Sequence, residues 1–291
     1  MSANEPLSIR KFFAGKRVLL TGATGFLAKA VMEKLLHDLP EVERIYLLIR
    51  PKFKKDGTHV DSRQRLEEEV YRNSAFLRLR DKMGERFEDF CAEKVDCVTG
   101  DLTRERLGLD EAEFRELAGK IDVIINSAAT VVFDERLDLA LNLNTLGPQR
   151  LLELARAGHA IYVHISTAYV CGRRTGNIPE KLLSPLEAID AQLPPGAPRP
   201  ERFVVQEEIA SLWQAVERVK GEWSAECERR KLDAESEEAR EELERRLVAA
   251  GMKRAHQLGW NDTYTFTKFL GEQLIYQQHG KVPTVIIRPS I

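Results

Sequence analysis

The chain has 291 residues, of which 43% are hydrophobic and 31% are charged, and its formal net charge is −2. These values are typical of a globular protein with one large core or two modest ones, and they exclude the strongly basic surface that nucleic-acid binding requires. The four cysteines and six histidines follow no metal-binding spacing, so we predict free thiols and no metal site.

No segment is predicted to direct the chain into or across a membrane. Residues 1–16 contain no apolar stretch of the secretory type, and no later run is long enough to cross a bilayer. We therefore predict a cytoplasmic location. Peripheral membrane contact and the oligomeric state are left open.

The first predicted elements are a buried strand over Arg17–Thr21 and a helix over Phe26–Leu36, joined by a glycine turn. Such a turn directs backbone N–H groups and the positive end of the helix toward one point, where a pyrophosphate binds. Gly22 permits the tight turn and Gly25 allows phosphates to approach, whereas Ala28 replaces the third glycine of the usual fingerprint. Alone, this pattern does not distinguish a dinucleotide site from a structural turn.

Further strands are predicted between helical segments along the rest of the chain. They cover Arg44–Arg50, Val95–Gly100, Asp122–Ser127, Ile161–Thr167 and Thr284–Arg288. Alternating strands and helices imply right-handed crossovers and a parallel sheet with helices on both faces. We therefore predict an α/β fold with a doubly wound parallel sheet of the Rossmann type, spanning residues 1–291.

Two segments depart from this alternation. Residues 51–93 form a charged connection, for which we predict two or three short helices, and residues 173–258 form an insertion that begins as a proline-rich loop. Apolar residues in the insertion recur at spacings of four and three, which predicts an amphipathic helix: Val205, Ile209, Leu212, Val216, Val219 and Trp223. We interpret it as a helical hairpin packed on the domain, and the charge-dense run 222–246 as a solvent-exposed face.

The end of the second strand indicates which dinucleotide would bind. NAD sites place an acidic residue there for the ribose 2′-OH, whereas this chain has Arg50, followed by Lys52, Lys54 and Lys55. A cation accommodates a 2′-phosphate, so NADP is favoured over NAD. The alternative is a solvated basic loop.

The next two strand ends fit the same site. The third strand ends at Asp101 and Leu102, where an aspartate beside the adenine is expected, and the fourth ends in the small residues 127–129. Small residues leave room for a cofactor at the switch point of the sheet.

Two pairs of residues are predicted to be catalytic. Tyr264 and Lys268 lie one turn apart at the start of a helix that runs to His279, and an ammonium near a phenol is expected to lower the phenol pKa toward neutrality. Ser166 and Thr167 lie at the end of the fifth strand, where a hydroxyl can hydrogen-bond a substrate carbonyl.

Several short segments together resemble a known family. They are TGATGFL at 21–27, NSAATVVF at 126–133, NTLG at 144–147, STAYVCG at 166–172, YTFTK at 264–268 and RPSI at 288–291. The chain resembles an extended short-chain dehydrogenase/reductase and, more narrowly, the Rossmann domain of fatty acyl-CoA reductases, which is related to thioester-reductase domains. The resemblance extends from Lys16 to Ile291.

The resemblance implies an NADPH-dependent reduction of a long-chain fatty acyl-CoA thioester to the aldehyde and onward to the fatty alcohol. It makes Thr167 the catalytic hydroxyl with Ser166 beside it, and Tyr264 the proton donor. Lys268 would tune Tyr264 and bind the nicotinamide ribose, and Asn144 would support the network. The predicted cofactor-binding set is Thr21, Gly22, Thr24, Gly25, Phe26, Leu27, Arg50, Lys52, Asp101, Leu102, Ser127, Ala128, Ala129, Asn144, Tyr264, Lys268, Pro289 and Ser290.

Relatives of this type continue beyond the RPSI segment into a carboxy-terminal substrate lobe, so we expect a truncated form without that lobe. Such a form should bind NADPH but reduce long-chain acyl-CoA poorly. The helical insertion has two alternative roles, a lid over the acyl chain or a partner-binding arm.

Two other functions remain open from the sequence. One is an extended short-chain dehydrogenase that acts on a nucleotide sugar as epimerase or dehydratase, against which Arg50 argues mildly. The other is a non-catalytic NADP-binding sensor, which would not need Tyr264 and Lys268. Acyl transfer through Cys171 is poorly supported, because no histidine is near it in the sequence.

Overall fold

A computed structural model describes residues 8–54 and 56–290, so Lys55 and Ile291 lie outside the described residues. The chain divides into two compact units. The first unit comprises residues 1–128, 150–165 and 281–286, and the second unit comprises residues 129–149, 166–280 and 287–291. The second unit therefore contains the predicted insertion together with four segments outside it, residues 129–149, 166–172, 259–280 and 287–291.

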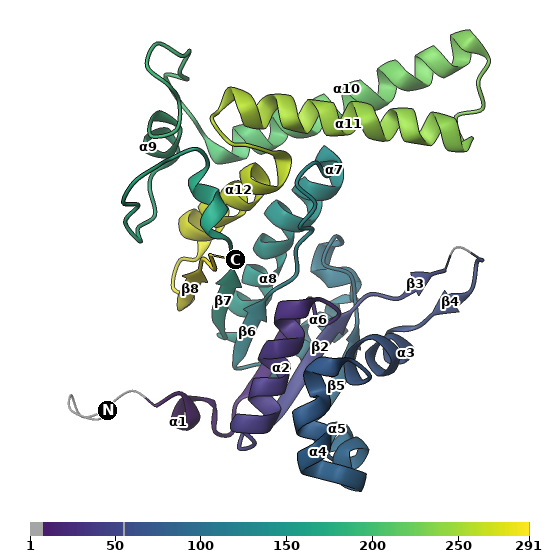
Figure 1. Ribbon diagram of the computed structural model, residues 1–291, viewed down its shortest axis with the longest axis vertical. Coiled ribbons are helices and arrows are strands. Elements are labelled where there is room, and N and C mark those ends of the chain that lie inside the picture. The colour runs from purple at the N-terminus through teal and green to yellow at the C-terminus, as the bar shows by residue number, and fades with distance from the viewer. Residues whose placement is uncertain (1–7, 55, 291) are drawn as a thin grey trace. The chain divides into compact units, whose positions relative to one another are not determined.

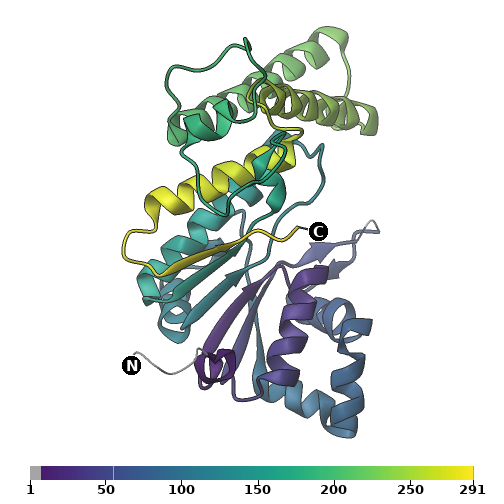
Figure 2. The same cartoon turned by 60° about the vertical axis from the view of Figure 1, so that its left-hand side comes forward.

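The first unit is built on a six-stranded sheet (Figures 1 and 2). Its strands are β1 (Arg17–Thr21), β2 (Arg44–Ile49), β5 (Val95–Thr99), β6 (Val123–Asn126), β7 (Ile161–Ile165) and β8 (Thr284–Ile287), in the spatial order β5-β2-β1-β6-β7-β8. The pairings β5–β2, β2–β1, β1–β6 and β6–β7 are all parallel. This order reverses direction between β1 and β6, as in a doubly wound Rossmann sheet, and it confirms the predicted fold class.

The predicted strands are confirmed with small differences at their ends. Five of them begin at the predicted residue, β6 begins one residue later, and the longest discrepancy is at β7, which ends at Ile165 rather than Thr167. The apolar runs of the central strands β1, β2 and β6 are largely buried on both faces of the sheet, whereas β5, β7 and β8 are more exposed. On one face, Val18 and Leu20 of β1 pack with Met32 and Leu36 of helix α2 (Phe26–Asp38) in a single core.

The connection after β2 contains the predicted short helices α3 (Ser62–Arg65), α4 (Leu77–Met83) and α5 (Phe87–Lys94). It also contains a two-stranded antiparallel ribbon of β3 (Lys52–Phe53) and β4 (His59–Val60), which the sequence analysis missed. Strands of two residues carry no measurable periodicity. The usable signal was the Asp56-Gly57 pair, since Gly57 takes a positive φ in the turn between the strands. The remaining helices of the first unit are α1 (Ile9–Phe13), α6 (Glu111–Lys120) and most of α8 (Gly147–Gly158).

The second unit is mainly helical. It contains α7 (Leu137–Ala140), a π-helical turn (Leu141–Leu146), α9 (Pro185–Asp190), α10 (Val205–Arg230), α11 (Glu237–Gln257) and α12 (Thr263–Gln278). Helices α10 and α11 form the predicted hairpin, and both contact α12 (Figure 1). Five of the six predicted seam residues of α10, Val205 to Val219, lie in or against the apolar core of the second unit, although Val219 is only half-buried. The sixth, Trp223, packs in a separate small cluster.

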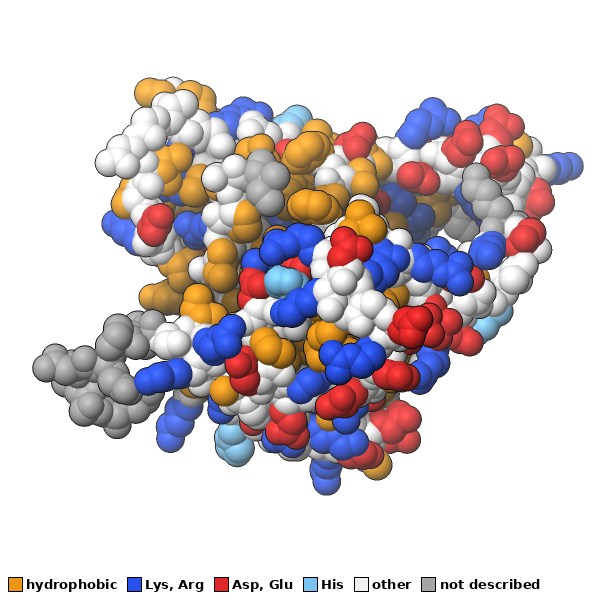
Figure 3. All heavy atoms as spheres, turned by 60° about the horizontal axis from the view of Figure 1, so that its bottom comes forward, with side chains coloured by type: hydrophobic (Ala, Val, Ile, Leu, Met, Phe, Trp, Pro, Cys, Tyr) orange, Lys and Arg blue, Asp and Glu red, His pale blue; other side chains and the backbone are white. Residues whose placement is uncertain are grey.

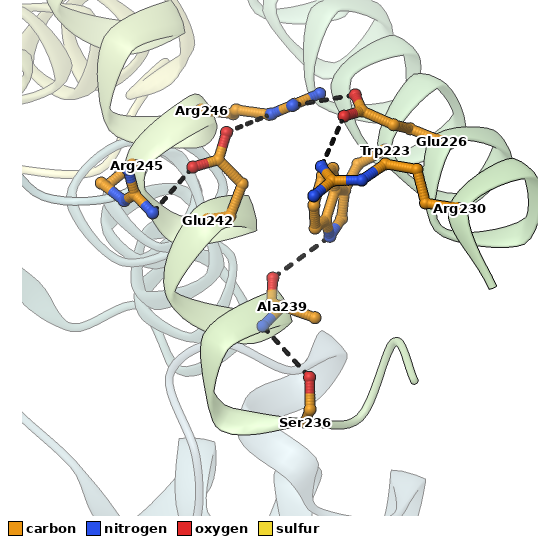
Figure 4. A network of polar contacts seen from close by, with 8 residues as sticks. All are labelled: Trp223, Glu226, Arg230, Ser236, Ala239, Glu242, Arg245 and Arg246. Atoms are coloured by element: carbon orange, nitrogen blue, oxygen red, sulfur yellow. Dashed lines mark hydrogen bonds and ion pairs between the residues drawn. The ribbon is translucent and has the colours of Figure 1, made fainter. Parts of the chain in front are cut away.

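Figure 4 shows how the outer parts of α10 and α11 are joined. The Trp223 indole donates to the Ala239 carbonyl at 3.1 Å, and the Arg246 guanidinium lies 4.4 Å above the Trp223 ring. Arg246 also binds Glu226 of α10 at 2.9 Å and Glu242 of α11 at 2.7 Å. The prediction of a solvent-exposed face over 222–246 is therefore wrong for its buried residues, Trp223, Cys227 and Ala239, because the charged side chains surround a small apolar contact between the helices.

The surface carries charges of both signs. On the face shown in Figure 3, basic and acidic side chains are interspersed rather than gathered by sign, in keeping with the net charge of −2. Within residues 8–54 and 56–290, none of the helices combines the length and the hydropathy that a bilayer span requires.

Candidate active site

The glycine turn of the first unit has the geometry of a phosphate-binding loop. Gly22 has a φ of +73°, and a Cβ there would lie 2.9 Å from backbone atoms of Ser127 and Ala128, so only glycine fits. Gly25 is exposed at the N-terminus of α2, and no side chain caps that helix end. The first backbone N–H groups of α2 are therefore left for a ligand. Around them Thr24 and Leu27 are half-buried and Phe26 is exposed.

The residues predicted to select the dinucleotide lie at the end of β2. The Arg50 guanidinium is exposed, and its Nη1 is 3.8 Å from an Asp101 carboxylate oxygen. Lys52 instead pairs with Glu69, which Arg65 also binds at 2.8 Å. The structure thus brings Arg50 and Asp101 together and directs Lys52 away to a carboxylate of its own. Leu102, the residue after Asp101, is buried, and its carbonyl accepts from Arg150 at 2.9 Å.

A buried hydrogen-bond network connects the carboxyl ends of three neighbouring strands. Thr21 of β1 donates to the Asn126 side-chain oxygen at 2.7 Å, and the Asn126 amide nitrogen lies 3.2 Å from both the Tyr162 hydroxyl and His164 Nδ1 of β7. The Ala128 backbone N–H lies 3.2 Å from the Thr21 hydroxyl and the Asn126 oxygen. We call these four side chains, Thr21, Asn126, Tyr162 and His164, the strand-end network. It positions Ser127 and Ala128 and was not predicted from the sequence, because its members are far apart in the chain.

The predicted catalytic residues lie together in the second unit. Asp262 caps α12 by accepting from Thr265 N at 2.7 Å, and this start places Tyr264 and Lys268 one turn apart, both buried. The Thr167 side chain lies beside the Tyr264 hydroxyl and favours its ionised form, which lowers the Tyr264 pKa. Thr167 Oγ1 also accepts from Tyr169 N at 3.2 Å, which orients the side chain.

Ser166 differs from its neighbour Thr167. Its backbone N–H donates to Ile287 O at 2.7 Å, whereas its buried hydroxyl has no hydrogen-bond partner among the residues that the structure describes. A buried hydroxyl without a partner is costly, so such a group indicates a role toward a ligand.

Burial sets the pKa of both groups on α12. It lowers the pKa of Lys268 to about 8, although the Glu272 carboxylate opposes the shift. It also raises the pKa of Tyr264 above its usual value, an effect that the neighbouring Thr167 side chain only partly offsets. The expectation of a lowered Tyr264 pKa is therefore wrong in this structure, because removing the phenolate from water outweighs any attraction to a lysine that is itself buried.

Asn144 joins the loop after β6 to helix α12. Its side-chain oxygen accepts from Thr130 N at 3.0 Å, and its amide nitrogen donates to Thr130 O at 3.2 Å and to the Thr267 hydroxyl at 3.3 Å. Gly271 allows this close packing, since a Cβ there would lie 2.4 Å from the Asn144 carbonyl oxygen. The structure therefore places Asn144 behind Tyr264 as a support for the loop. Ala129, at the start of that loop, is half-buried.

A buried ion pair on α12 was not predicted from the sequence. Glu272 is fully buried, one turn after Lys268, and binds Arg288 through both carboxylate oxygens at 2.6 and 2.9 Å. The available signal was a glutamate within an otherwise apolar stretch of helix. Of the two residues that follow Arg288, Pro289 is half-buried and accepts from Ala168 N at 2.9 Å, and Ser290 is exposed.

Two further predictions concern nucleophiles and metals. Cys171 is buried in the apolar core of the second unit, where packing accounts for it. In the described part of the chain, no group of three or more histidine, cysteine or acidic residues is placed to hold a metal ion.

Sequence comparison identifies similar proteins along nearly the whole chain. Residues 20–291 match an NAD-binding family described as male sterility protein. The chain is 37% identical to the chloroplastic fatty acyl-CoA reductase 2 of Arabidopsis thaliana, over 99% of this chain and 43% of that protein. It is 36% identical to the alcohol-forming fatty acyl-CoA reductase of Simmondsia chinensis, over 98% of this chain and 53% of that protein. The chain thus spans about half the length of the curated relatives it matches.

Solved structures support the fold. The terminal R domain from the myxalamid PKS-NRPS biosynthetic pathway aligns with a TM-score of 0.57 and 22% identity, over 95% of this chain and 49% of that one. A thiolation-reductase di-domain from an archaeal non-ribosomal peptide synthetase aligns with a TM-score of 0.50 and 22% identity, over 94% of this chain and 41% of that one. At this level of identity the likeness shows a shared fold.

Proposed function

The chain belongs to the male sterility protein family, and on that premise we propose that it carries the cofactor-binding and proton-donating parts of a fatty acyl-CoA reductase. The observation that carries the proposal is the arrangement of Thr167 beside the buried Tyr264, which lies one turn before the buried Lys268 on α12. This arrangement can hydrogen-bond a carbonyl oxygen and donate a proton to it.

The cofactor would be held by the exposed N-terminus of α2 and by the backbone at Gly22 and Gly25. A nicotinamide cofactor, when bound, supplies the hydride. After hydride adds to the thioester carbon, Tyr264 donates a proton to the carbonyl oxygen, and its raised pKa keeps the phenol protonated until that moment. The resulting hemithioacetal releases coenzyme A as the thiol to give the aldehyde, and a second hydride and proton give the alcohol. The buried Ser166 hydroxyl, which bonds no other described residue, donates a second hydrogen bond to the same carbonyl oxygen.

The substrate and product follow from the named relatives. Because these are fatty acyl-CoA reductases, one of them alcohol-forming, we assign a long-chain acyl-CoA as substrate, the aldehyde as first product and the alcohol as final product. The nucleotide-sugar and sensor functions are not favoured.

The test is consumption of NADPH with hexadecanoyl-CoA by the full-length protein and by this 291-residue chain, with chromatography of the products. We expect aldehyde and alcohol from the full-length protein, and NADPH binding by both forms. Turnover of a nucleotide sugar, or no product from any acyl-CoA, would contradict the proposal.

We assign NADPH rather than NADH through Arg50. The guanidinium is exposed and its contact with Asp101 is long, so it is free to pair with a 2′-phosphate, whereas Lys52 is already paired with Glu69. Arg50→Asp should weaken NADPH binding at least tenfold more than NADH binding, because attraction becomes repulsion. Lys52→Gln is the control and should change the preference little. Calorimetric titration with both cofactors measures this, and equal losses for the two would remove the assignment.

A further inference from the structure

An exposed apolar surface lies beside the Tyr264 ring within the second unit. It consists of Val131, Val132, Phe133 and Tyr169, whose exposed fractions are 68%, 50%, 54% and 50%. We call these four residues the apolar platform. The Phe133 ring packs edge-on against the Tyr264 ring, with centroids 5.8 Å apart, and against the Tyr169 ring at 6.4 Å.

Backbone and polar contacts hold the platform in place. Tyr264 N donates to Phe133 O at 3.2 Å, and the Thr130 hydroxyl donates to Glu135 at 2.7 Å across the base of the loop. Tyr169 is held from the other side, since its N–H donates to the catalytic Thr167 hydroxyl. These contacts keep apolar side chains in the solvent although burial would lower the free energy of the protein, so the exposure is built into the fold.

The position of the platform identifies its occupant. A carbonyl hydrogen-bonded to Tyr264 has its substituents next to the Phe133 ring, and all four platform side chains lack charge. The phosphates of coenzyme A would require cations, whereas a hydrocarbon chain requires only apolar contact area.

We propose that the apolar platform binds the acyl chain of the thioester and sets the preference for chain length. The inference rests on the proposed function, which it deepens by naming the residues that contact the hydrocarbon. Each methylene buried on the platform adds affinity for longer chains, so contacts remote from the carbonyl position it for reduction.

The experiment compares two chain lengths in the full-length protein carrying Val131→Ser and Val132→Ser together. Steady-state assays give the ratio of kcat/KM for hexadecanoyl-CoA to that for butanoyl-CoA. We expect this ratio to fall at least tenfold, because the variant removes apolar contact area from which the longer chain gains more affinity than the shorter one. Val285→Ser is the matched control, since Val285 is a similarly exposed valine, 49%, on strand β8 of the first unit. The control ratio should stay within twofold of wild type.

A binding measurement separates this inference from the proposed function. Calorimetry of hexadecanoyl-CoA and of coenzyme A gives the contribution of the acyl chain without turnover. If the protein reduces no acyl-CoA but the double variant loses this contribution, the platform assignment stands and the proposed function fails. An unchanged ratio in both measurements overturns the assignment. Loss of a dimer in the double variant, seen by sedimentation without a change in either ratio, would show that a second copy covers the platform instead.

Discussion

The strand-end network of the first unit and the catalytic corner of the second unit, Ser166, Thr167, Tyr264 and Lys268, both gather buried polar side chains. Each contains a tyrosine whose pKa burial raises above the usual value. They differ in how their hydrogen bonds are used. Asn126 connects all the members of the first group, whereas the second leaves the Ser166 hydroxyl without a partner and forces a lysine into the interior.

This difference separates a structural role from a functional one. A network whose side chains hydrogen-bond to one another across strands stabilises one arrangement of those strands. A corner with an unpartnered hydroxyl and a buried cation is destabilised until a ligand completes it. A raised tyrosine pKa alone does not distinguish the two, since both regions show it.

The largest effect should come from exchanging the two tyrosines for phenylalanine. Tyr264→Phe removes the proton donor, so turnover should fall by about 10²–10⁴-fold while NADPH affinity is retained. Tyr162→Phe removes one member of the strand-end network, so it should retain turnover and lower the free energy of unfolding by about 1 kcal/mol. Kinetic assays and urea titration of both variants measure this. Equal losses of turnover would erase the distinction between the two regions.

The second prediction concerns how the stability of the fold depends on pH, because the catalytic corner contains a buried lysine. The folded pKa of Lys268 is about 8 and its ordinary value is 10.5, so the unfolded chain binds this proton more tightly. Burial of the charged lysine therefore destabilises the fold below pH 8, and the penalty is relieved as the pH rises toward 10.5. Relative to Lys268→Met, wild type should gain up to about 3 kcal/mol of stability between pH 7 and 11.

Chemical denaturation at a series of pH values measures that difference. The exposed Lys253→Met variant is the control for loss of a lysine on a helix surface. A difference between wild type and Lys268→Met that stays constant over this range would mean that folding does not change the pKa of Lys268.

The prediction with the smallest expected effect compares one polar side chain from each region. Asn126→Ala leaves Thr21, Tyr162 and the Ala128 N–H without their shared partner, so it should lower the free energy of unfolding by about 2 kcal/mol. Ser166→Ala deletes a hydroxyl that bonds no described residue, so its stability should change by less than about 0.5 kcal/mol while turnover falls. Thermal unfolding of both variants decides this, and a strongly destabilised Ser166→Ala would place Ser166 among the structural residues.

The local pattern of the sequence determined the framework of this protein. Short apolar runs predicted the six strands, the Gly22 turn predicted the entry to α2, and the spacing of Tyr264 and Lys268 predicted that they share one helix face. Each of these features depends on residues within a few positions of one another, and periodicity and turn chemistry report on that range.

Only the tertiary structure decided which polar groups are partners and which are not. The partners of Asn126 come from two other strands, and Arg288, directly after strand β8, binds Glu272 of helix α12. The spacing of these residues in the sequence does not predict their contacts, because the crossover connections of the fold bring them together. The direction of the Tyr264 pKa shift was mispredicted for the same reason. A pKa in a protein depends on burial as much as on a neighbouring charge, and burial is a property of the whole packed chain.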